Sequence, residues 1–75
     1  YKAINLSVLE DLAAKHNLTE ITFETFVEAG FVSSKDKVKI LGNGAITRAL
    51  AVKANAFSKS AEAAIVAAGG SIEKL

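Results

Sequence analysis

The side chains best suited to chemistry lie between Phe57 and Ala61, where Ser58 and Ser60 flank Lys59. A serine directly before helix-forming residues is a typical N-cap, so we expect a helix to begin here. The free amides and positive dipole end of a helix start attract an anion, and hydroxyl and ammonium groups beside them add hydrogen bonds. Ordinary helix capping without a ligand explains the same residues equally well, so both interpretations stay open.

More polar groups are predicted along the same edge. Arginine holds a phosphate with two hydrogen bonds, and asparagine bonds to a base edge or a ribose hydroxyl. The side chains expected to converge on one outer edge, beside the uncovered helix start, are Asn43, Arg48, Lys53, Asn55, Ser58, Lys59 and Ser60.

Catalysis is not expected. His16 is the only histidine, there is no cysteine, and the serine hydroxyls have no base nearby in the sequence. The adjacent Glu10 and Asp11 do not face each other on a helix. Gly42–Asn43–Gly44 is too short for a nucleotide-binding glycine motif. We therefore predict no enzyme activity, no metal, no cofactor and no small-molecule substrate, and we give His16 a structural role at a helix end.

The net charge of +1 hides a strong asymmetry. Residues 1–30 hold two lysines against five acids, which gives −3, whereas residues 31–60 hold six Lys and Arg against Asp36, which gives +5. A dipolar domain of this kind presents a basic face to a polyanion, although an unevenly charged solvated surface is the simpler alternative. No apolar run approaches the roughly 18 residues of a membrane span.

These groups must be positioned by a small fold. The 75 residues are 51% hydrophobic, which predicts one globular domain over residues 1–75. The expected class is α/β, with short strands and three helices. Helices are predicted over 8–15, 23–29 and 59–68, with Ser7 (in a capping box with Glu10), Thr22, and either Ser58 or Ser60 as N-caps. Extended segments are predicted over 3–6, at 21, and over 37–41, 50–55 and 71–75.

Lysines recur with period two at Lys35, Lys37 and Lys39. If the strand starts early enough, the three ammonium groups share its outer face at intervals of roughly 6.5–7 Å, comparable to the phosphate spacing of a nucleic-acid strand. Gly42–Asn43–Gly44 follows as a turn.

Two stretches resemble a known family. They are K-I-L-G-N-G-A-I, from Lys39 to Ile46, and F-S-K-S-A-E-A-A-I-V-A-A-G-G, from Phe57 to Gly70. They look like the C-terminal globular domain of the bacterial-type large-subunit ribosomal protein numbered fifteen. The resemblance extends back through I-N-L-S-V-L-E-D-L and F-V-E-A-G-F-V, and so covers nearly the whole chain. It implies an RNA-binding structural protein, with residues 1–75 as one α/β, RNA-binding globular domain of irregular β-β-α turns. It also supports Lys53, Ser58, Lys59 and Ser60 as an RNA-facing edge.

The chain departs from that family in two respects. The long, basic, glycine-rich N-terminal extension of the family is absent, so we expect these residues to be part of a longer protein. Position 55 is often histidine in the family, and Asn55 keeps hydrogen-bonding capacity but carries no charge.

The predicted function is a structural constituent of the large ribosomal subunit that binds its RNA through a basic edge, reading shape and backbone. Neighbouring ribosomal proteins are further expected partners, and the expected location is a cytoplasmic ribosome or an organellar one. The alternative is a protein–protein interaction module whose basic face docks an acidic partner.

Overall fold

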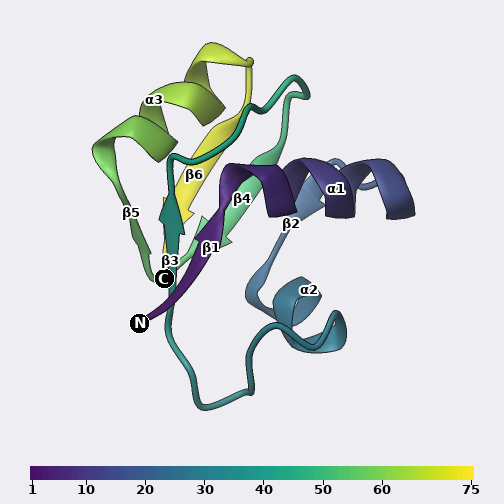
Figure 1. Ribbon diagram of the computed structural model, residues 1–75, viewed down its shortest axis with the longest axis vertical. Helices are drawn as coiled ribbons and strands as arrows, with labels where there is room; N and C mark the ends of the chain where they lie inside the picture. The colour runs from purple at the N-terminus through teal and green to yellow at the C-terminus, as the bar shows by residue number, and fades with distance from the viewer.

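Six short strands and three helices follow one another in a computed structural model that describes all residues from 1 to 75 (Figure 1). In chain order the elements are β1 (Lys2–Asn5), α1 (Leu6–His16), β2 (Glu20–Ile21), α2 (Phe23–Glu28), β3 (Val38–Leu41), β4 (Ala51–Ala54), β5 (Ala56–Phe57), α3 (Lys59–Ala67) and β6 (Ser71–Lys74). The predicted α/β class with short strands and three helices is confirmed.

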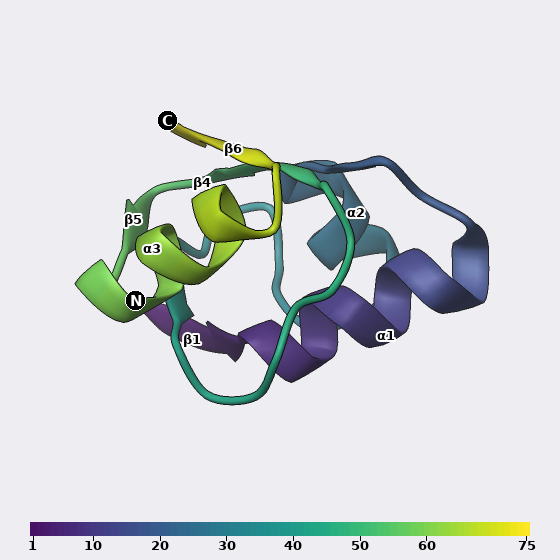
Figure 2. The same ribbon diagram turned by 90° about the horizontal axis from the view of Figure 1, so that it is seen from above.

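The strands form two parallel sheets, ordered β1-β3-β5 and β2-β4-β6. The chain alternates between them, so each strand is followed by one in the other sheet. The crossovers from the first sheet to the second are α1, the segment 42–50 and α3, and Figure 2 shows these connections wrapping around the space between the sheets. Parallel strands require such crossovers, because a tight hairpin joins only antiparallel neighbours.

The core lies between the two sheets and is entirely hydrophobic, with no buried polar or charged residue. Ile4, Val38 and Ile40 face it from the first sheet, and Ile21, Val52 and Ala54 face it from the second. Leu9 of α1, Phe26 of α2 and Ile65 of α3 are fully buried as well. Val38, Ile40, Leu50, Val52 and Ala54 are all buried, as expected for alternate residues of the extended segments 37–41 and 50–55.

Two of the three predicted N-caps are confirmed. The Thr22 hydroxyl accepts from the Thr25 amide in a capping box, and the Ser58 hydroxyl accepts from the Ala61 amide. The Ser7–Glu10 capping box is wrong, because α1 begins earlier and has Asn5 at its N-cap. Ser7 lies in the first turn, where its amide donates to the carbonyl of Asn43, and Glu10 bonds to Thr47 instead.

Candidate nucleic-acid interface

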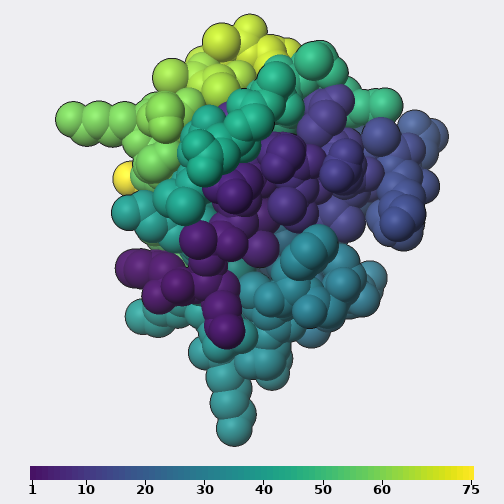
Figure 3. All heavy atoms as spheres, viewed as in Figure 1, coloured from purple at the N-terminus to yellow at the C-terminus, as the bar shows by residue number.

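Three connections start at the carboxyl end of the β1-β3-β5 sheet: α1 follows β1, Gly42–Asn43–Gly44 follows β3, and α3 begins after β5. The turn packs against both helix starts. A Cβ added to Gly42 would collide with Ser60 Oγ, and one added to Gly44 would lie 2.8 Å from the Ser7 amide nitrogen. In the space-filling view the teal segment after β3 fills the surface between the purple α1 and the green α3 (Figure 3). Only glycine permits this close approach.

Four of the predicted residues meet at this end of the sheet. Asn43 is exposed in the turn, and Lys59 and Ser60 are exposed at the start of α3. The Ser58 hydroxyl lies 3.3 Å from the Ser60 hydroxyl and accepts from the Ala61 amide at 3.2 Å. The two serine hydroxyls and the Ala61 amide at the helix start therefore already have hydrogen-bond partners within the chain. The ammonium group of Lys59, by contrast, forms no ion pair.

Arg48 lies elsewhere, against α1. Its Nε is 3.6 Å from Oε2 of Glu10, and the same carboxylate accepts from the Thr47 amide at 3.0 Å and from the Thr47 hydroxyl at 2.8 Å. These two hydrogen bonds, followed by the charge of Arg48, hold the pKa of Glu10 below its usual value. Arg48 thus helps to fasten the segment 42–50 to the helix.

Lys53 lies on the other sheet, in β4. Its Nζ is 3.8 Å from a Glu20 carboxylate oxygen and 3.9 Å from one of Glu73, so both neighbouring strands supply a carboxylate. This acid–base–acid row leaves the outer face of β2-β4-β6 without free positive charge. The expectation that all seven side chains converge on one edge is therefore not met.

Asn55 is the single residue between β4 and β5, at the corner where the chain leaves one sheet and enters the other. Its amide donates to the Val38 carbonyl at 3.1 Å, and its Oδ1 accepts from the Val38 amide at 2.8 Å. The carbonyl oxygen of this side chain therefore serves the fold.

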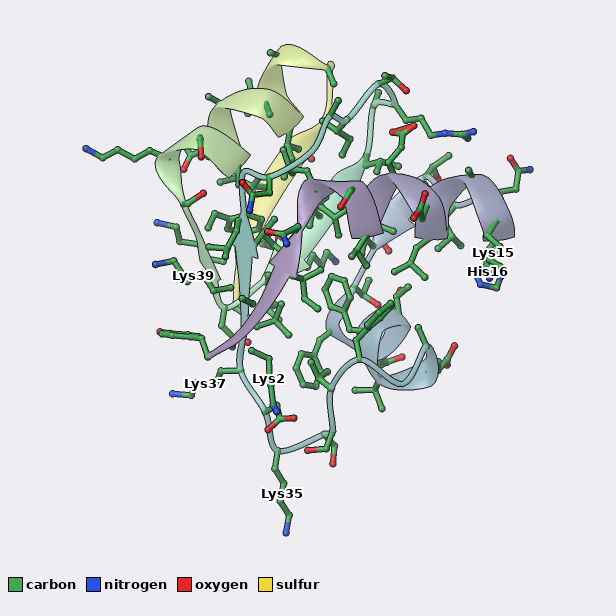
Figure 4. All side chains as sticks on the ribbon, viewed as in Figure 1. Lys2, Lys15, His16, Lys35, Lys37 and Lys39 are labelled. Carbon is green, nitrogen blue, oxygen red and sulfur yellow. The ribbon has the colours of Figure 1, made fainter.

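A second group of basic side chains lies outside the predicted site. Lys2, Lys35, Lys37 and Lys39 cluster around the amino ends of β1 and β3, and none of them forms an ion pair. In Figure 4 Lys37 and Lys39 extend from one side of β3, whereas Lys35 projects from the loop before it. The period-two recurrence of lysine at positions 35, 37 and 39 was the sequence feature that indicated this group. Because β3 begins only at Val38, Lys35 lies outside the strand.

Other chemistry has little support in the structure. His16 is exposed in the last turn of α1, at the far end of that helix from the basic cluster (Figure 4). No three His, Cys, Asp or Glu side chains are grouped so as to hold a metal ion. None of the helices has the length and apolar character needed to cross a membrane.

Fold and surface together define a small α/β module with free lysines along one parallel sheet. The chain belongs to the family of ribosomal proteins 50S-L15 and 50S-L18e and their 60S counterpart, whose model matches residues 3–73. Because this family consists of ribosomal proteins, the prediction that the chain is not an enzyme is confirmed.

Individual relatives are similar over the whole chain. It is 60% identical to the large ribosomal subunit protein uL15 of Bacteroides thetaiotaomicron over 75 residues, which are 100% of this chain and 51% of that protein. The same protein of Porphyromonas gingivalis strain W83 is 57% identical over the same shares of the two chains. That of Amoebophilus asiaticus is 51% identical over 70 residues, 93% of this chain and 46% of the relative. The chain thus spans about half the length of the relatives it matches.

Proposed function

We propose that this chain is a structural constituent of the large ribosomal subunit and binds large-subunit ribosomal RNA. The observation that carries the proposal is that most of the basic side chains have no acidic partner. Of nine Lys and Arg side chains, only Arg48 and Lys53 form ion pairs. Unpaired ammonium groups are available to phosphates, and releasing condensed counterions from RNA favours binding. The names of the bacterial relatives support the ribosome as the site of action, in the bacterial cytoplasm.

At the carboxyl end of β1-β3-β5, Lys59 contacts a phosphate in this proposal, while Asn43, Ser58 and Ser60 add hydrogen bonds to phosphate or sugar. Such contacts position a protein on RNA and carry little sequence information. Recognition is therefore of RNA shape and backbone. RNA contact by Arg48, Lys53 or Asn55 stays a prediction, because RNA would have to replace the intramolecular partner of each side chain.

The test is equilibrium binding of the chain to large-subunit ribosomal RNA and to poly-glutamate over a range of salt concentrations. For RNA, we expect log K to fall linearly with log salt concentration, by about 0.7–0.9 per phosphate contact. Poly-glutamate carries charge without the geometry of a sugar–phosphate backbone, and we expect it to bind far more weakly. Absent RNA binding, or equal binding to both polymers, would overturn the proposal, and equal binding would favour an acidic protein partner.

A further inference from the structure

The outer face of the β1-β3-β5 sheet is an open basic surface. Lys37 precedes β3 and Lys39 lies within it, both on the face opposite to the buried Val38 and Ile40. Lys39 is in register with Ala3 of β1 and Ala56 of β5. Its neighbours on this face are therefore one-carbon side chains, which leave the lysine stem and the sheet accessible to a large ligand.

No carboxylate neutralises these lysines. The nearest acid in sequence, Asp36, is turned back into its own loop, where its Oδ2 accepts from the Ser33 amide at 2.9 Å and the Asp36 amide donates to the Ser33 carbonyl at 3.1 Å. Neither Lys37 nor Lys39 forms an ion pair within the chain. Lys53 on the other sheet, by contrast, lies between two glutamates.

Taking the proposed function as its basis, we propose that Lys37 and Lys39 form a phosphate-binding track along β3. An RNA backbone runs over the outer face of β1-β3-β5, and Lys35, in the loop before β3, extends the track beyond the amino end of the sheet. Alternate residues of a strand lie roughly 6.5–7 Å apart, so Lys37 and Lys39 match successive phosphates of one RNA strand.

The track also has a direction. β3 leads from Lys37 and Lys39 to the Gly42–Asn43–Gly44 turn, which packs against Ser60 at the start of α3. A backbone following β3 therefore passes from the lysine pair to the polar carboxyl end of the same sheet. The lysine pair and the polar side chains at the carboxyl end of the sheet therefore form one continuous RNA-binding surface. Only Ile40, Leu41 and Gly42 separate Lys39 from Asn43 at the tip of the turn.

The test compares Lys37→Gln/Lys39→Gln with Lys15→Glu, which lowers the net charge by the same two units at the far end of α1 (Figure 4). Glutamine keeps most of the side-chain stem, so we expect circular dichroism and the urea midpoint of the double variant to match the wild type. The measurement is the salt dependence of binding to large-subunit ribosomal RNA and to a short RNA duplex of arbitrary sequence. For the double variant we expect the slope to fall in magnitude by about 1.4–1.8, and for Lys15→Glu by less than one contact.

The outcomes separate the two proposals. If the wild type binds neither RNA, the proposed function fails. If it binds but the double variant keeps the full slope, the β3 track is overturned while the proposed function stands. An equal loss in Lys15→Glu would mean that net charge alone governs binding, which also overturns the track. If the salt slope falls on both RNAs for the double variant but not for Lys15→Glu, the result supports a contact with the RNA backbone that is independent of sequence.

Discussion

Asn55 and Val38 exchange two hydrogen bonds at the corner between the sheets, from the Asn55 amide to the Val38 carbonyl at 3.1 Å and from the Val38 amide to Asn55 Oδ1 at 2.8 Å. The second bond is one that a neighbouring strand would ordinarily supply. Here the asparagine side chain takes that place, because the backbone at this point is turning from β4 into β5. The corner thus leaves no unpaired amide at the fully buried Val38.

Replacing Asn55 with alanine should destabilise the fold. It leaves the Val38 amide without an acceptor, which costs about 1–3 kcal/mol in the free energy of unfolding. Urea denaturation measures the change, with Asn43→Ala as the matched control, because the exposed Asn43 side chain forms no hydrogen bond within the chain. Equal stability of the two variants would contradict the structural role, and loss of RNA binding by Asn55→Ala without loss of stability would restore Asn55 to the RNA site.

Gly70→Ala should be far more damaging than Gly30→Ala. A Cβ on Gly70 would collide with the Leu50 carbonyl oxygen and lie 2.8 Å from the Leu50 nitrogen, and this backbone contact has no flexible side chain to yield. We expect a loss of roughly 3 kcal/mol or more. Gly30 has a φ of +83° but open space around it, so alanine there costs only about 1 kcal/mol. Thermal melts compare them, and similar melting temperatures would refute the packing argument.

The Glu10 carboxylate should make stability depend on pH in acid. The amide and hydroxyl of Thr47, and then Arg48, lower its pKa in the folded state from about 4.5. A depressed folded-state pKa gives stability that is present above the unfolded pKa and is lost as pH falls through the folded pKa. Glu10→Gln should therefore flatten the stability profile below about pH 4.5, measured by urea unfolding at successive pH values.

The neighbouring residue supplies the control for that experiment. Asp11 is exposed and accepts no hydrogen bond, so Asp11→Asn should leave the acid profile close to that of the wild type. A Glu10→Gln profile that matches the wild type would show that the contact between α1 and the segment 42–50 is not coupled to protonation.

Lys59 and Lys53 should differ in RNA binding, although both are lysines of the predicted edge. Lys59→Ala should reduce the salt slope by about one contact, roughly 0.7–0.9, since this ammonium group has no partner to lose. Lys53→Ala should change it less, because Glu20 and Glu73 already neutralise that charge. A larger change for Lys53 would mean that RNA displaces both carboxylates.

Local pattern was enough for most of the elements. Thr22 and Ser58 marked helix starts because a hydroxyl that satisfies a free amide acts within one turn of chain. Alternation marked β3 and β4 because burial on one face imposes period two. The prediction of Ser7 as an N-cap was wrong because α1 starts two residues before the expected position, with Asn5 at its N-cap. The Ser7 amide instead donates to the carbonyl of Asn43, which is distant in the sequence.

The sequence by itself determined the family, the α/β class, every element except β5 to within a few residues, and the excess of positive charge in the middle of the chain. Only the tertiary structure decided which of those charges are free. Lys53 and Arg48 carry the same charge in the sequence as Lys37 and Lys39, but strand pairing brings Glu20 and Glu73 to Lys53, and the crossover 42–50 brings Glu10 to Arg48. Each of these ion pairs joins residues that are distant along the chain, so its existence depends on which segments become neighbours, and no local pattern encodes that.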